Sequence, residues 1–152
     1  MVPEFPAGRL AGIDYGTVRV GIAVTDRRQR LASPYEIHAR RGSTADAKYF
    51  QEFVAGEAIV GFVVGLPVHL DGRESQKSRE AREFGQWLAG VTKVPVTFFD
   101  ERFTTAEADQ FLGAAKLTKK RRKARRDKLA AQIMLTAYLE SSSRGEPRGL
   151  DD

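Results

Sequence analysis

Hydrophobic and polar residues alternate in two short stretches near the start of the chain. Leu10 and Ile13 lead up to Asp14, and every second position from Val18 to Val24 is apolar. A period of two residues is typical of a β-strand that buries one face. Gly16 separates the two stretches, and glycine tolerates the backbone conformations of a tight turn. Residues 10–26 are therefore predicted to form two strands joined by a turn.

Three further strands are expected. Residues 31–37 form a short candidate strand, which Pro34 places at an edge of the sheet because proline cannot donate to a strand ladder. Residues 58–66 are a continuous apolar run rich in β-branched side chains, the pattern of a strand buried on both faces. Residues 94–99 form the last candidate strand.

Apolar residues with helical spacing are found between these strands, at 43–56 and 71–90. Ser43 is the predicted N-cap of the first helix, and Asp71 with Glu74 resembles a capping pair for the second. A strand–helix–strand order requires a crossover connection, and such connections join parallel strands. The pattern therefore indicates an α/β fold with parallel pairing in the sheet.

The C-terminal third of the chain is predicted to be mostly helical. Thr104 and Glu107 have the spacing of a capping box that would begin one helix. Residues 113–124 are expected to form a flexible basic loop before a last helix at 125–140. Residues 141–152 are polar and rich in helix breakers, so they are expected to be a frayed tail.

Composition predicts one globular domain spanning residues 1–152, with 41% hydrophobic and 30% charged residues. The absence of cysteine excludes disulfides and thiolate metal ligands. The first ten residues lack the apolar core of a secretory signal, and the longest apolar run, 58–68, is too short to cross a bilayer. We therefore expect a cytoplasmic protein without membrane contact.

Positive charge is concentrated in one segment. The net charge is +5, yet residues 116–128 hold nine Lys or Arg and one acid, which leaves a net −3 for the rest of the chain. A basic block on a mildly acidic body predicts a polyanionic partner such as nucleic acid. A solvated basic loop without a partner is the alternative.

Three acidic residues stand where the end of a strand or helix faces the predicted core. Asp14 ends the first strand, and Glu101 follows the last one. Asp127 begins the last helix on its apolar side, because Ala130, Ala131 and Met134 follow it at helical spacing. Ligands of open α/β sheets bind outside the carboxyl ends of parallel strands, so we expect the three carboxylates to converge there.

Each acid also has an ordinary structural explanation. Asp14 can accept backbone N–H groups in its turn, and Asp127 can favour a helix start through the helix dipole. Glu101 can pair with Arg102. Asp100 is the alternative to Glu101, because successive strand residues point to opposite faces and only one of the two can enter the site.

Converging carboxylates predict a divalent metal site. Oxygen ligands without a cysteine or histidine cluster favour Mg²⁺ or Mn²⁺. Two such ions about 4 Å apart can activate water and stabilise the leaving oxygen of a phosphodiester. The basic segment would hold the substrate backbone, so the hypothesis is a metal-dependent nuclease acting on structured nucleic acid.

Four ordered motifs resemble the YqgF (RuvX) family over residues 8–140. They are GIDYGTVRVGIAVTD at 12–26, VGLPVHLDG at 64–72, DERFTTAEA at 100–108, and Asp127 before an alanine-rich helix. This family is described as Holliday junction resolvases and as nucleases that mature the end of the small-subunit ribosomal RNA precursor. The resemblance implies an RNase H-like fold, with a five-stranded mixed sheet of three antiparallel and then two parallel strands, flanked by helices on both faces.

The resemblance also assigns roles to individual residues. The catalytic and metal-binding acids fall on Asp14, Glu101 and Asp127. Residues 65–72 and Arg102 would border the substrate. Together with Arg102, basic side chains of the positively charged segment are the predicted nucleic-acid contacts: Lys119, Lys120, Arg121, Arg122, Lys123, Arg125 and Arg126.

Two substrates are compatible with the resemblance. The preferred interpretation is processing of the 5′ end of pre-16S rRNA in ribosome biogenesis, and the alternative is resolution of four-way DNA junctions. Resolving a junction needs two symmetric cuts and favours a dimer, whereas trimming an RNA needs one cut. Monomer and homodimer therefore both stay open.

Two other classes of protein compete with a nuclease. The Asp-x-Gly-Thr turn also resembles the phosphate loop of actin-like and sugar-kinase ATPases, but those proteins close a second similar domain over the nucleotide, and this chain is too short to contain one. The other class is a non-catalytic RNA-binding module with purely structural acids. Nuclease activity should need Mg²⁺ or Mn²⁺ and vanish in Asp14→Asn, whereas binding alone would survive that change and weaken steeply with salt.

Overall fold

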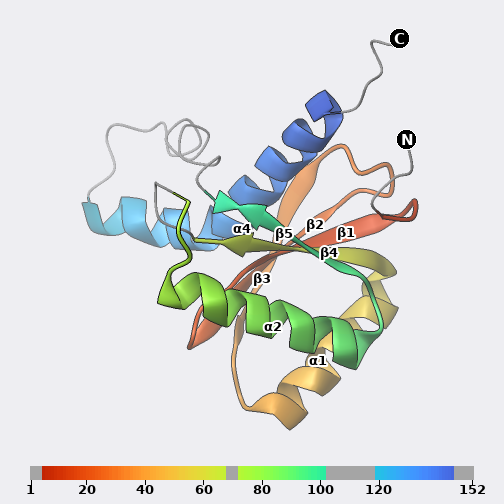
Figure 1. The fold of residues 1–152 in the computed structure, drawn as a ribbon, viewed down its shortest axis with the longest axis horizontal. Coiled ribbons are helices and arrows are strands. Elements are labelled where there is room, and N and C mark those ends of the chain that lie inside the picture. Colours follow the sequence, from red (N-terminus) through yellow and green to blue (C-terminus); the bar gives the residue numbers. More distant parts are fainter. Residues whose placement is uncertain (1–4, 68–71, 102–118, 146–152) are drawn as a thin grey trace.

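The computed structural model describes residues 5–67, 72–101 and 119–145 and contains one five-stranded sheet (Figure 1). The strands lie in the order β3-β2-β1-β4-β5. The pairs β3–β2 and β2–β1 are antiparallel, and β1–β4 and β4–β5 are parallel, which is the mixed sheet expected from the sequence. In chain order the elements are β1 (Arg9–Asp14), β2 (Arg19–Thr25), β3 (Ala32–Ala39), α1 (Ser43–Glu57), β4 (Ile59–Leu66), α2 (Gln76–Thr92), β5 (Val96–Asp100) and α4 (Lys119–Gly145).

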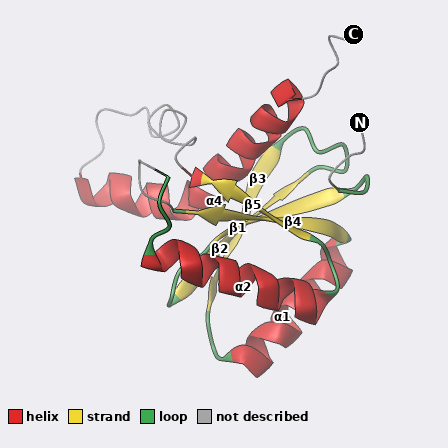
Figure 2. Cartoon of the chain, in the orientation of Figure 1, coloured by secondary structure: helices red, strands yellow, loops and turns green. Residues whose placement is uncertain are grey.

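Helices cover both faces of the sheet, with α1 and α2 on one face and α4 on the other (Figures 1 and 2). Each face has its own apolar core. Alternate residues of β1 enter opposite cores, so Ala11 and Ile13 pack with α1 and α2, whereas Leu10 packs with α4. Gly12 lets α4 approach closely, because a Cβ atom at this position would lie 2.9 Å from Cβ of Leu135. Among the described helices, none is both long enough and apolar enough to cross a membrane.

The observed starts of α1 and α2 differ from the predicted ones. The N-cap of α1 is Gly42 rather than Ser43, and its φ of 108° explains why glycine stands there. The α2 helix begins at Gln76, after the N-cap Ser75, and not at the predicted Asp71–Glu74 pair. Ser75 forms a capping box with a second serine three residues on, a pattern that satisfies the first free N–H groups of the helix.

The last helix is longer than predicted. Residues 119–124, which were expected to belong to a flexible loop, form the first turns of α4, and the helix continues past the predicted end at 140 to Gly145. Lysine and arginine are good helix formers, so a run of them can extend an amphipathic helix into solvent. The predicted helix that begins at Thr104, the remainder of the loop (113–118) and the end of the tail (146–152) lie outside the described residues.

Candidate active site

Asp14 ends β1 with its side chain on the face that α4 covers. It pairs with Gly21 of β2, where an added Cβ atom would lie 3.4 Å from Cβ of Asp14 and 3.7 Å from Cβ of Ala131 in α4. The carboxylate is therefore enclosed between the sheet and the helix. The pKa of Asp14 is raised to about 6, with burial as the largest cause; the Lys77 charge lowers it and the Asp127 charge adds to the rise.

Glu101 directly follows β5 and lies on the same face as Asp14. Phe99, two residues earlier, packs edge-on against Tyr138 of α4, with ring centroids 5.8 Å apart. Phe98 packs with the opposite core, and continuing this alternation assigns Glu101 to the α4 face and Asp100 to the other. The sequence left this choice open, and the backbone geometry favours Glu101.

Glu101 occupies space that a glycine on the neighbouring strand leaves free. A Cβ atom at Gly65 of β4 would overlap Oε2 of Glu101. The pKa of Glu101 is raised to about 7, mainly by burial and next by the Asp14 charge, while the Lys77 charge opposes the rise. The carboxylates of β1 and β5 therefore repel each other across the end of β4.

Asp127 is an exposed residue of α4, and its negative charge raises the pKa of Asp14. The predicted acids thus form two interacting pairs that share Asp14. Within the described residues, however, no three acidic or imidazole side chains form a group that could hold a metal ion as they stand. Coordination of one ion by all three acids accordingly stays a prediction.

Lys77 is a residue of the site that sequence reasoning missed. It lies in the first turn of α2, and its positive charge lowers the pKa of both Asp14 and Glu101. The available signal was positional, because this helix begins just after β4, whose carboxyl end lies between the two acids.

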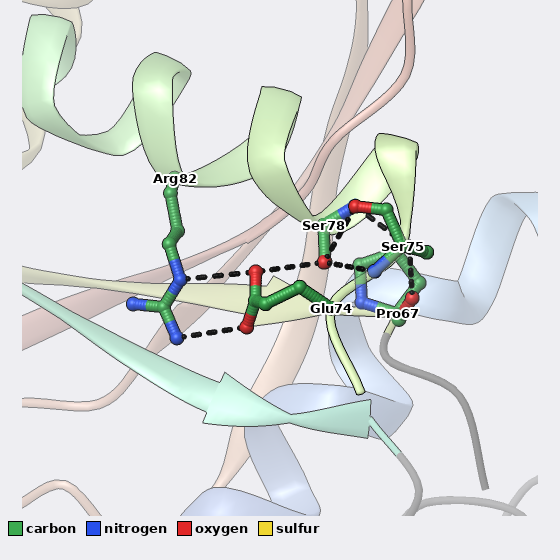
Figure 3. A network of polar contacts seen from close by, with 5 residues as sticks. All are labelled: Pro67, Glu74, Ser75, Ser78 and Arg82. Carbon is green, nitrogen blue, oxygen red and sulfur yellow. Dashed lines mark hydrogen bonds and ion pairs between the residues drawn. The ribbon is translucent and has the colours of Figure 1, made fainter. Parts of the chain in front are cut away.

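Polar contacts fix the start of α2 (Figure 3). The hydroxyl of Ser75 donates to the carbonyl of Pro67 at 2.7 Å and accepts the N–H of Ser78 at 2.9 Å. Glu74 accepts hydrogen bonds from the hydroxyl of Ser78 at 2.9 Å and from Arg82 at 3.1 and 3.2 Å. These bonds tie the helix that carries Lys77 to the end of β4.

A cavity of about 560 Å³ opens beside Asp14. Its walls are the turn that follows β1, the first turns of α2, and parts of β2, β3 and α4. The lining residues are Asp14, Tyr15, Gly16, Thr17, Val18, Arg19, Gly21, Ile37, Gln76, Lys77, Glu80 and Asp127.

Arg40 holds the turn that forms one wall of this cavity. Its guanidinium donates to the hydroxyl of Tyr15 and to the carbonyl of Gly16, both at 3.2 Å. It also lies over the rings of Tyr15 and Phe84, 5.3 and 5.4 Å from their centroids. Arg40 therefore fixes the two residues that follow Asp14, through hydrogen bonds and through packing on aromatic rings of the core.

The predicted nucleic-acid contacts are described only in part. Lys120, Arg121 and Arg125 are exposed near the start of α4. Arg102 lies wholly outside the described residues. The side chains of four other predicted contacts also lie outside the described part of the structure: Lys119, Arg122, Lys123 and Arg126.

Sequence comparison places the chain among known proteins. The family profile described as "RuvX: Holliday junction resolvase" matches residues 8–141. A relative from Rhodopirellula baltica is 48% identical over 147 residues, which cover 95% of this chain and 85% of the relative. A relative from Sphingopyxis alaskensis is 37% identical over 147 residues, covering 93% and 96%. Both are named "Putative pre-16S rRNA nuclease".

Solved structures resemble the fold at low sequence identity. RuvC of Thermus thermophilus, in complex with a Holliday junction substrate, matches with a TM-score of 0.54 and 15% identity, over 90% of this chain and 97% of RuvC. The yeast mitochondrial Holliday junction resolvase Ydc2 matches with a TM-score of 0.51 and 8% identity, over 93% and 82%. These likenesses confirm the RNase H-like fold class. The family profile and the sequence relatives show that the chain belongs to the RuvX family.

Proposed function

We propose that this protein is a metal-dependent nuclease that hydrolyses phosphodiester bonds in structured nucleic acid, with the 5′ end of pre-16S rRNA as its substrate. The observation that carries the proposal is the pair of half-buried, mutually repelling carboxylates of Asp14 and Glu101 at one edge of the sheet. Buried like charges are costly, and such sites are typically functional. The names of the sequence relatives support the choice of substrate.

The donor set suits a hard divalent cation. Asp14, Glu101 and Asp127 offer only carboxylate oxygens, and repulsion between Asp14 and each of the other two would be relieved by a positive ion. Gly65 leaves room for the Glu101 carboxylate at this edge. These three residues would hold Mg²⁺ or Mn²⁺, in a two-ion arrangement. Bound there, the metal supplies the charge that lowers the pKa of water and stabilises the leaving oxygen.

The remaining side chains have positioning roles. Lys77 presents a positive charge that faces both Asp14 and Glu101, where it attracts the phosphate to be cut. Exposed basic residues near the start of α4, such as Arg121 and Arg125, hold the nucleic-acid backbone. The protein acts in the cytoplasm, as expected for processing of an rRNA precursor.

Cleavage of four-way DNA junctions is the second candidate function. The family description names this activity, and the T. thermophilus RuvC structure contains a junction substrate. Two symmetric cuts would require two copies of the chain, so a homodimer accompanies this alternative and a monomer is sufficient for RNA processing.

The test is cleavage of a pre-16S rRNA 5′ fragment and of a four-way DNA junction in parallel, with Mg²⁺ and with Mn²⁺. Wild type is expected to cut the RNA, and Asp14→Asn to lose that activity. Asp26→Asn is the matched control, since Asp26 is an exposed aspartate in the turn between β2 and β3. Equal cleavage by Asp14→Asn and wild type would refute the role of the acids. Tight, salt-sensitive binding without cleavage by wild type would instead favour a non-catalytic RNA-binding module.

A further inference from the structure

One wall of the cavity beside Asp14 is apolar and has no role in the proposed metal site. Val18 and Ile37 line it, with 64% and 42% of their surfaces exposed. They are two of the four large hydrophobic residues that are exposed in the described part of the chain. Exposed apolar surface inside a polar pocket marks a place where a ligand is expected to bind.

The sheet places this apolar surface in line with the acid. Asp14 pairs with Gly21, and Gly21 pairs with Ile37, so the three positions form a row across β1, β2 and β3 on the same face. Gly21 has no side chain, and Ala131 of α4 lies over it, since a Cβ atom added at Gly21 would be 3.7 Å from Cβ of Ala131. Asp14, Val18 and Ile37 line the same cavity, so a flat ligand group that lies against the two apolar side chains is held close to Asp14.

The other walls of the cavity are polar. Lys77 and Arg19 contribute positive charges, Glu80 of α2 contributes a negative charge, and the amide of Gln76 donates to Glu80 at 3.0 Å. A nucleotide combines the features that match these walls: an anionic phosphate, a polar sugar, and a flat base with polar edges. A volume of about 560 Å³ lies within the range of pockets that hold ligands of this size.

We propose that this cavity receives one unpaired nucleotide next to the phosphodiester that is cut. The base lies against Val18 and Ile37, and its phosphate is held by Lys77 and Arg19. A base within a duplex is stacked and paired, so it cannot enter a pocket without leaving the helix. The proposal rests on the proposed nuclease function and deepens it, because it makes an unpaired position at the cut site a requirement of the substrate.

Binding to the pocket is measured with the fluorescent base 2-aminopurine in a short single strand, prepared as RNA and as DNA. The protein carries Glu101→Gln to prevent cleavage, and Glu101 does not line the cavity. Emission is expected to rise on binding, because the base leaves its stacked neighbours for an aliphatic wall. The double variant Val18→Ser/Ile37→Ser should bind about tenfold more weakly. Leu31→Ser, at an apolar residue that is 74% exposed and outside the cavity, should bind as Glu101→Gln alone does.

The phosphate contacts have their own matched pair. Arg19→Gln should weaken binding of the same probe, whereas Arg27→Gln, at an exposed arginine in the turn after β2, should not. The stronger response of the RNA or the DNA probe identifies which sugar the pocket accepts.

Cleavage then tests the requirement for an unpaired nucleotide. Wild type should cut a duplex with a single unpaired nucleotide at least tenfold faster than the fully paired duplex, and Val18→Ser/Ile37→Ser should lose this difference. Unchanged 2-aminopurine emission, or equal weakening by Leu31→Ser, overturns the pocket assignment. Failure of wild type to cut any substrate with Mg²⁺ or Mn²⁺ overturns the nuclease function instead, and the fluorescence measurement still decides the pocket.

Discussion

Removing the charge of Asp14 should stabilise the metal-free protein at alkaline pH. The fold raises the pKa of this carboxyl from 3.8 to about 6, mainly through burial. Each pKa unit corresponds to about 1.4 kcal/mol, so keeping Asp14 ionised costs the folded state roughly 3 kcal/mol above pH 6. Asp14→Asn removes this cost, and it also relieves the repulsion that raises the pKa of Glu101. For a chain of this length, roughly 3 kcal/mol corresponds to a rise in Tm of about 6–12 °C.

The effect has a defined pH dependence. Because the pKa of Asp14 is raised in the folded state, protonation of Asp14 contributes to the stability of wild type. This contribution is fully present below pH 3.8 and is lost as the pH rises through about 6. The advantage of Asp14→Asn should therefore be largest at pH 8 and disappear near pH 4. Urea unfolding in EDTA at pH 8, 6 and 4 measures it. Asp26 is a control of opposite sign: backbone N–H groups of Leu31 and Arg30 lower its pKa, so Asp26→Asn should destabilise the protein at pH 8.

Addition of Mg²⁺ should reverse the order of stability. A cation that binds the acids stabilises wild type by mass action, and Asp14→Asn loses one of its ligands. If Asp14→Asn is less stable than wild type at pH 8 in EDTA, the argument that the ionised carboxylate of Asp14 costs folding free energy is refuted. An equal gain from Mg²⁺ in both proteins would refute its role as a metal ligand.

Three further changes probe the neighbouring features. Gly65→Ala should displace the Glu101 carboxylate, since a Cβ atom there would overlap Oε2, and should reduce both cleavage rate and Mg²⁺-dependent stabilisation while the fold persists by circular dichroism. Ser75→Ala removes the N-cap of α2 and should cost about 1 kcal/mol in urea unfolding, whereas an unchanged midpoint would contradict the capping role. Neutralising four arginines of α4 should weaken binding of all nucleic-acid sequences alike and make binding less dependent on salt. A loss confined to one sequence would count against contacts with the nucleic-acid backbone. The four residues are Arg121, Arg122, Arg125 and Arg126.

Much of the sheet could be predicted from local patterns. The apolar run in β4 follows directly from burial on both faces. The alternation in β2 predicted burial of one face only, but α4 also covers the other face, where Gly21 and Ala23 are small enough to let the helix approach. Helix starts were less predictable, because several polar residues compete for each N-cap. Asp46, for example, accepts hydrogen bonds from buried His38 at 2.9 Å and from the N–H of Arg41 at 3.1 Å, contacts that depend on where β3 ends.

The sequence was sufficient to predict the acidic residues of the candidate site, but not the residues and the cavity that surround them. Asp14 and Glu101 stand out because charges at the ends of apolar strands need an explanation. Lys77 carries no such signal, since a lysine in the first turn of a helix is usually solvated. The cavity likewise depends on Gly21 and Ile37, whose significance appears only when the pairing of β1, β2 and β3 is known.

The first strand and the last helix build the candidate site together, and this has a consequence for protein synthesis. Asp14 is made early, but Asp127 and the α4 surface that encloses Asp14 are made near the end. A chain that terminates prematurely before α4 lacks both. Incomplete products of translation therefore cannot assemble the proposed group of acids.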